Sequence, residues 1–176
     1  CNHLRKMDIF YVGYLFKGKT FYLAKKEWFD NKLLGFFIRK LGGIPVDRDN
    51  TDMQSVRNSL KVLKDNKRLC IFPEGTRNKS GNTDIMPLHG GAAMLAFKTN
   101  AKIVPLNINK PAKFMHKNDI YVGEPFDFSE YQGQRLDTEL NHKLTEIMYQ
   151  KLCDAKSEQE KLLQEKKDAK LAKKNK

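Results

Sequence analysis

The chain has 176 residues, 40% of them hydrophobic, which excludes a disordered chain and fits one globular domain with a real core. Its 33 Lys and Arg residues exceed its 21 Asp and Glu residues, giving a net charge of +12. This charge predicts an anionic partner, which can be nucleic acid, an anionic membrane surface or a phosphorylated small molecule.

The cysteines and the length of the apolar runs give further information on metal binding, redox state and membrane spans. The three cysteines, at positions 1, 70 and 153, have no metal-site spacing with the four histidines, so we expect reduced cytosolic thiols and no bound metal. No apolar run approaches the roughly 20 residues that span a bilayer. The chain starts at Cys1 without an initiator methionine or a leader, and we interpret it as a piece of a longer protein. We expect the part present to be soluble or peripheral.

The apolar pattern predicts alternating strands and helices. We expect strands at 20–26, 44–47, 68–72, 102–108 and 119–126. We expect helices at 27–43, 50–66, 89–100 and from Gln134 onward, and in the second of these the apolar face is formed by Val56, Leu60 and Leu63. This order predicts an α/β fold with a mixed, largely parallel central sheet flanked by helices, and with a C-terminal helical extension.

The end of the chain differs in composition from the rest. From Asp154 onward it has eight Lys and five acidic residues but few apolar ones. We therefore divide the chain into a domain, 1–150, and a Lys-rich helical tail, 151–176, which we expect to be a solvated, fraying helix.

His3 and Asp8 are the first candidate pair for chemistry. Five helical steps turn the chain by about 500°, so on one helix these side chains would point about 140° apart. They converge only if the chain turns between them, with His3 in a loop or strand end and Asp8 near the start of the next helix. That arrangement suits acid/base chemistry, whereas the alternative is an exposed histidine and an N-cap aspartate.

The stretch "FPEGTR", 72–77, is the second candidate. Pro73 ends the buried strand, and Gly75 permits a tight turn that places the next residues beyond the sheet. Arg77 then offers a planar fork of donors that suits a phosphate, with Thr76 beside it. The alternative is an ordinary turn in which Glu74 and Arg77 form only a salt bridge.

Four stretches together resemble the motif blocks of the glycerolipid acyltransferases, especially the 1-acyl-glycerol-3-phosphate acyltransferases. They are "NHLRKMD", "GGIPVDR", "FPEGTR" and "IVPLNI", in this order, and the resemblance covers about residues 1–125. It implies that 1–150 is an acyltransferase catalytic domain that moves a fatty acyl group from a thioester to the free sn-2 hydroxyl of 1-acyl-glycerol-3-phosphate, giving phosphatidic acid. The implied co-substrate is acyl-CoA or acyl-carrier protein, with no other cofactor.

The resemblance also implies roles for the candidate residues. His3 is the expected base, and Asp8 fixes its tautomer and stabilises the imidazolium. Arg77 is expected to hold the acceptor's phosphate. Glu74 and Thr76 are expected to shape the loop, and Gly75 to give access to it.

Two further cations belong to the expected phosphate site by the same resemblance, Lys25 and Arg48. From the residues alone, Lys25 fits a solvated strand end, and Arg48 fits either a pair with Asp47 or an anion contact. The expected location is the cytoplasmic face of a membrane, peripheral or anchored through the missing N-terminus, with lysophosphatidic acid and an anionic membrane surface as partners.

Three alternatives stay open. The acceptor can be glycerol-3-phosphate or another lysophospholipid. A basic nucleic-acid-binding module is disfavoured, because the aromatic residues do not alternate with Lys and Arg as a stacking platform requires. The apolar run from Ile9 to Phe16 can dip into a membrane interface, line an acyl tunnel or build the core.

Overall fold

The computed structural model describes residues 1–47, 52–80, 82–111 and 118–174. Its α-helices are α1 (Asp8–Leu15), α2 (Lys32–Lys40), α3 (Met53–Lys64), α4 (Gly91–Thr99) and α5 (Thr138–Lys174). Its strands are β1 (Thr20–Lys25), β2 (Gly43–Val46), β3 (Arg68–Cys70), β4 (Leu106–Ile108) and β5 (Ile120–Val122). Two short 3-10 helices are η1 (Lys26–Phe29) and η2 (Ser129–Tyr131).

The strands form a parallel sheet in the order β2-β1-β3 and an antiparallel pair, β4-β5. The α/β class and the C-terminal helix are confirmed. We expected one central sheet, but the described strands form two sheets because the N-terminal segment lies between them. The backbone nitrogen of Cys1 donates to the carbonyl of Ile71, and the Asn2 amide bonds both backbone groups of Ile108, at 2.8 and 3.0 Å.

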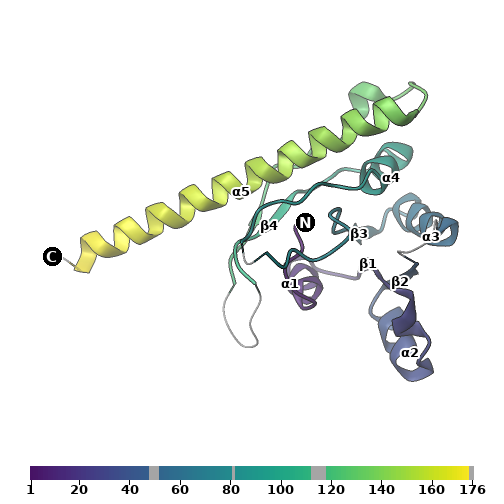
Figure 1. Ribbon diagram of the computed structural model, residues 1–176, viewed down its shortest axis with the longest axis horizontal. Helices are drawn as coiled ribbons and strands as arrows, with labels where there is room; N and C mark the ends of the chain where they lie inside the picture. Colours follow the sequence, from purple (N-terminus) through teal and green to yellow (C-terminus); the bar gives the residue numbers. More distant parts are fainter. Residues whose placement is uncertain (48–51, 81, 112–117, 175–176) are drawn as a thin grey trace.

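The helices lie on opposite sides of these sheets, with α5 along one side and α1 and α2 on the other (Figure 1). The larger buried core lies between α4 and α5, where Phe97 packs with Leu144 and Met148 around Phe128. A smaller core, formed by Val12, Cys70 and Leu106 near the N-terminal segment, joins α1 to both sheets. The second core therefore fixes the place where His3 and Asp8 lie.

Several expected elements are shorter in the structure, for local reasons. The helix expected at 27–43 divides into η1 and α2, because the Asn31 side chain caps α2 by accepting from the Leu34 N–H at 3.0 Å. The strand expected at 68–72 ends at Cys70, since the carbonyl of Phe72 accepts from Gly75 in a turn. The strand expected at 102–108 is reduced to β4, preceded by Pro105, which has no N–H to donate.

The long C-terminal helix α5 is continuous across residue 150, and its first half packs on the body of the protein. Leu152, Ala155 and Gln159 are buried, although they lie within the segment expected to be a solvated tail. The helix beyond them is mostly exposed and projects from the body (Figure 1). The division of the chain at residue 150 stays a prediction. No helix in the described part of the chain is both long and apolar enough to cross a membrane.

Candidate active site

His3 and Asp8 meet in space, because the chain turns between them as predicted. His3 lies in the extended N-terminal segment, residues 6–7 form a turn, and Asp8 is the first residue of α1. His3 Nδ1 lies 3.0 Å from Asp8 Oδ2, and the His3 ring stacks on Phe72 with centroids 4.1 Å apart. The histidine side chain is 11% exposed and the aspartate is fully buried.

The environment of Asp8 fixes the orientation of the histidine ring. Asp8 Oδ2 also accepts from the backbone N–H groups of Leu4 and Arg5, each at 2.7 Å. An oxygen that already accepts from two backbone amides at the start of a helix is an acceptor toward the histidine as well. Nδ1 of His3 then carries the proton and donates to Asp8, which leaves Nε2 as the acceptor. Within the part of the chain that the structure describes, Nε2 has no partner.

Glu74 holds the backbone of the histidine. Its carboxylate accepts from the His3 N–H at 2.8 Å and from the Met86 N–H at 3.3 Å, and the side chain is buried. The carbonyl of His3 accepts from the Asn78 N–H at 2.8 Å. Both sides of the His3 peptide are thus fixed by the loop that follows β3. Among the described residues, Glu74 forms no salt bridge with Arg77.

We expect the buried Glu74 carboxyl to make stability depend on pH. Burial raises the pKa of Glu74 above its ordinary 4.5, and the two N–H bonds only partly oppose this. The resulting stabilisation is complete below pH 4.5 and is lost as the pH rises through the raised pKa. In urea unfolding from acid to neutral pH, the wild-type free energy of unfolding should therefore fall relative to that of Glu74→Gln. A difference between the two proteins that does not change with pH would contradict this.

A small cavity lies at the carboxyl ends of the parallel strands, beside the histidine. Its volume is about 250 Å³, and its lining residues are Leu23, Val46, Cys70, Phe72, Gly75 and His89. Gly75 has a φ of +67°, and a Cβ there would lie 2.6 Å from the His89 ring, so both conformation and space require glycine. Ligands of parallel sheets bind at this edge, where loops follow the strands.

The remaining predicted site residues are less tightly placed. Arg77 is half-buried and directly precedes Asn78, which binds the His3 carbonyl, whereas Thr76 is exposed. Lys25 ends β1 and pairs with Glu27, with Nζ 2.5 Å from Oε1. Arg48 lies outside the described residues. The structure thus brings His3, Asp8 and Glu74 together and puts Gly75 and Arg77 on the same loop.

The sequence matches a known protein family over more than half of its length. The model of the family described as Acyltransferase matches residues 1–109. The chain belongs to the acyltransferase family. It is 31% identical over 137 residues to a 1-acyl-sn-glycerol-3-phosphate acyltransferase of Bacillus subtilis, an alignment that covers 74% of this chain and 67% of the relative. It is 30% identical to the enzyme of that name from Streptococcus pneumoniae, over 82% of this chain and 56% of the relative.

A solved structure shares the fold of this acyltransferase chain. The crystal structure of the 1-acyl-sn-glycerophosphate (LPA) acyltransferase from Thermotoga maritima aligns with a TM-score of 0.61 at 23% identity, covering 88% of this chain and 64% of that one. The chain thus spans between about half and two thirds of these three bacterial relatives.

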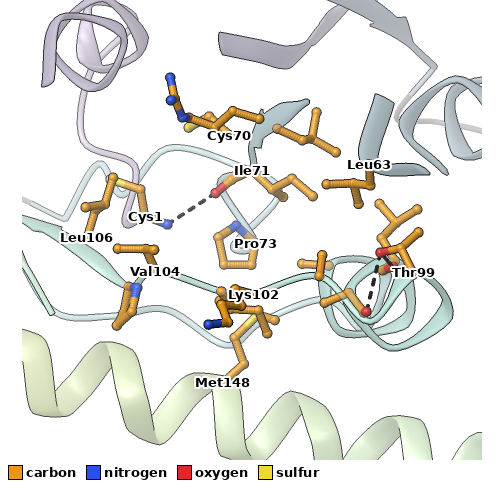
Figure 2. Close-up of a pocket in the computed structure, with 18 of the residues that line it drawn as sticks. Cys1, Leu63, Cys70, Ile71, Pro73, Thr99, Lys102, Val104, Leu106 and Met148 are labelled. Carbon is orange, nitrogen blue, oxygen red and sulfur yellow. Dashed lines mark hydrogen bonds between the residues drawn. The ribbon is translucent and has the colours of Figure 1, made fainter. Parts of the chain in front are cut away.

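A second, larger cavity in the acyltransferase domain lies between the two sheets and the α4–α5 layer. Its volume is about 620 Å³, within the usual range for small-molecule sites. Figure 2 shows Cys1, Ile71, Pro73, Val104 and Leu106 around it. Other lining residues include Val12 and Phe16 of the run from Ile9 to Phe16, and Cys70, which lines both cavities.

Sequence reasoning missed several contacts around the candidate active site. Asn2 ties the histidine segment to β4, Phe72 stacks on the ring, and His89, the first residue of the helix expected at 89–100, lines the small cavity. The sequence around Asn2 gives no signal for its contact, because the partner, Ile108, lies 106 positions away. Burial raises the pKa of the Cys70 thiol to about 11, so this thiol stays protonated.

Proposed function

We propose that the protein transfers a fatty acyl group from an acyl thioester to the free sn-2 hydroxyl of 1-acyl-glycerol-3-phosphate, giving phosphatidic acid. The observation that carries this proposal is the His3–Asp8 pair at 3.0 Å, held by Glu74 within a domain of the acyltransferase family. Support comes from relatives that bear the name of this activity in Bacillus subtilis and Streptococcus pneumoniae.

The chemistry needs a base, because a neutral alcohol is a poor nucleophile at neutral pH. In the proposed mechanism, Nε2 of His3 takes the proton of the hydroxyl as its oxygen attacks the thioester carbonyl carbon. Asp8 stabilises the imidazolium through Nδ1. When the tetrahedral intermediate collapses, the carbon–sulfur bond breaks and the leaving thiolate takes the proton from the imidazolium. The acceptor's own oxygen is the nucleophile, so no acyl-enzyme forms.

Positioning of the two substrates supplies the rest of the catalysis. Arg77 holds the phosphate of the acceptor through its planar fork of donors, with Lys25 and Arg48 as further cations of this site. Thr76 and Gly75 shape the approach to it. The Gly75 N–H already donates to the Phe72 carbonyl at 3.1 Å, so an oxyanion donor in this turn must be a later residue.

The larger cavity is the proposed place of a fatty acyl chain. Its wall contains Leu63, Leu95, Val104 and Met148, which suit a hydrocarbon chain, and its lining residues Cys1 and Pro73 lie close in sequence to His3 and Glu74. The apolar run from Ile9 to Phe16 then has two roles, since Val12 and Phe16 line this cavity while Phe10 and Tyr14 are exposed.

Replacing Arg77 with alanine should raise the KM for lysophosphatidate by about tenfold to a hundredfold with a smaller change in kcat, because the phosphate loses a charge-assisted hydrogen-bond pair. The assay is steady-state kinetics of thiol release from acyl-CoA. Arg57→Ala, which removes an exposed arginine of α3, is the matched control and should leave the KM unchanged. An unchanged KM in the Arg77 variant would remove this residue from the phosphate site.

The choice of substrates is tested by one assay. Lysophosphatidate is compared with glycerol-3-phosphate as acceptor, each with acyl-CoA and with acyl-carrier protein as donor. The acylated product is measured in each case, which is phosphatidic acid from lysophosphatidate and lysophosphatidate from glycerol-3-phosphate. We propose preference for lysophosphatidate and work at the cytoplasmic face of a membrane, where this lipid lies. Steeply salt-dependent binding to arbitrary RNA, without consumption of a thioester, would instead favour a nucleic-acid-binding module.

A further inference from the structure

An unusually apolar surface lies on α2 and the residues that flank it, including the chain's one tryptophan, Trp28, which belongs to η1. We call it the α2 surface, and its exposed residues are Trp28, Leu33, Leu34, Phe36, Phe37 and Leu41. Leu33 is 69%, Phe36 58% and Phe37 52% exposed. Contiguous exposure of this kind marks an interaction site on a folded protein.

The geometry of α2 explains why these side chains have no cover among the described residues. The helix packs on the body through its buried residues, Gly35 and Ile38. Gly35 lies so near the backbone of η1 that an added Cβ would be 2.9 Å from the carbonyl oxygen of Phe29. Leu33, Phe37 and Leu41 are spaced four residues apart and form a row on another face. In Figure 1, α2 lies on the side of the molecule away from α5.

The charges around the α2 surface select its partner. The exposed segments 5–7 and 25–41 contain seven cations and two acidic residues. The cations are Arg5, Lys6, Lys25, Lys26, Lys32, Arg39 and Lys40. Here an exposed helix carries Phe and Leu, Trp28 lies in the short helix before it, and Lys and Arg lie beside them. This is the composition of segments that lie in the interface of an anionic bilayer.

This surface is joined to the candidate active site. Lys6 belongs to the turn between His3 and Asp8, and its Nζ lies 6.0 Å from the centroid of the Trp28 ring. The exposed side chains of Met7, Phe10 and Tyr14 begin one residue after Lys6. A bilayer in contact with Trp28 therefore reaches the turn between His3 and Asp8.

We infer that the α2 surface docks on an anionic lipid bilayer, with Trp28 and the phenyl rings of α2 in the acyl-chain boundary and the neighbouring lysines and arginines on the headgroups. The inference rests on the proposed function, because a docked α2 would bring the turn beside His3 to an acceptor that lies in the membrane.

The test uses vesicles of phosphatidylcholine with or without phosphatidylglycerol and the fluorescence of Trp28. We expect co-sedimentation with the anionic vesicles and a shift of Trp28 emission to shorter wavelength. The double variant Phe36→Ser/Phe37→Ser should bind at least about tenfold more weakly, because two rings no longer leave water. The matched control, Leu162→Ser/Leu171→Ser, removes two exposed leucines of α5 and should bind as the wild type does.

Three results would overturn the inference. The first is equal vesicle binding by the α2 variant and the wild type, and the second is co-sedimentation without a change in Trp28 emission. The third is a wild-type protein that binds no vesicles but forms a dimer, when the α2 variant is a monomer. Circular dichroism confirms that each variant is folded. Acyl transfer to lysophosphatidate dispersed in detergent separates the two proposals. The α2 variant should retain this acyl-transfer activity, because the assay contains no bilayer. If the wild-type protein docks on vesicles but transfers no acyl group, the proposed function is refuted and the docking inference is retained.

Discussion

Replacing His3 with alanine should reduce kcat/KM for acyl transfer by about 10² to 10⁴-fold, the usual contribution of a general base. The imidazole is fixed by Asp8 at 3.0 Å and by the ring of Phe72, and Nε2 is the atom left to accept the hydroxyl proton. Without it, the acceptor must be deprotonated by water. Thiol release coupled to phosphatidic acid formation measures the loss.

The matched control for this variant is His142→Ala, because His142 is an exposed histidine on α5, far along the chain from the site. Its activity should equal that of the wild type. Thermal unfolding of the His3 variant should show a folded domain, since the backbone bonds of His3 to Glu74 and Asn78 do not involve its ring. Full activity in the His3 variant would refute the assignment of the base.

Replacing Asp8 with asparagine should cost a similar factor, about 10² to 10⁴-fold in kcat, with a small change in the KM for the acceptor. The amide can still accept from the Leu4 and Arg5 N–H groups, but it no longer offers a negative charge to the imidazolium. The tautomer that leaves Nε2 unprotonated is then no longer favoured. Steady-state kinetics over the acceptor concentration separates kcat from KM.

Asp65→Asn is the control for charge removal, because Asp65 is an aspartate at the end of α3 whose carboxylate pairs with Lys67 at 2.9 Å. Its kinetics should match the wild type. A change confined to the acceptor KM in the Asp8 variant would instead mean that this carboxylate shapes the substrate pocket and does not support the histidine.

The alternation of strands and helices was predictable because it depends on local apolar patterns. The turn between His3 and Asp8 was predictable too, since a spacing of five cannot share a helix face. The buried face of α3 was not. We expected Val56, Leu60 and Leu63, which are only half-buried, whereas Ser55, Ser59 and Val62 are buried. Small side chains there let neighbouring elements approach closely, a tertiary effect that an apolar pattern does not contain.

The contacts that complete the site depend on residues far apart in sequence. Glu74 binds the N–H of His3 across 71 positions, and Asn2 binds Ile108 across 106. Neither pairing has a local signal, and only the docking of the N-terminal segment between the two sheets creates them. We expected Glu74 to shape its loop. In the structure its carboxylate binds the backbone N–H groups of His3 and Met86.

The central claim is that the acceptor's own hydroxyl, activated by His3, attacks the thioester. Mass spectrometry of the intact protein after incubation with acyl-CoA, with and without lysophosphatidate, tests it most directly. The account predicts an unchanged protein mass in both samples, and one phosphatidic acid per thiol released when the acceptor is present. A protein carrying one acyl group, formed without the acceptor and discharged when lysophosphatidate is added, would contradict it.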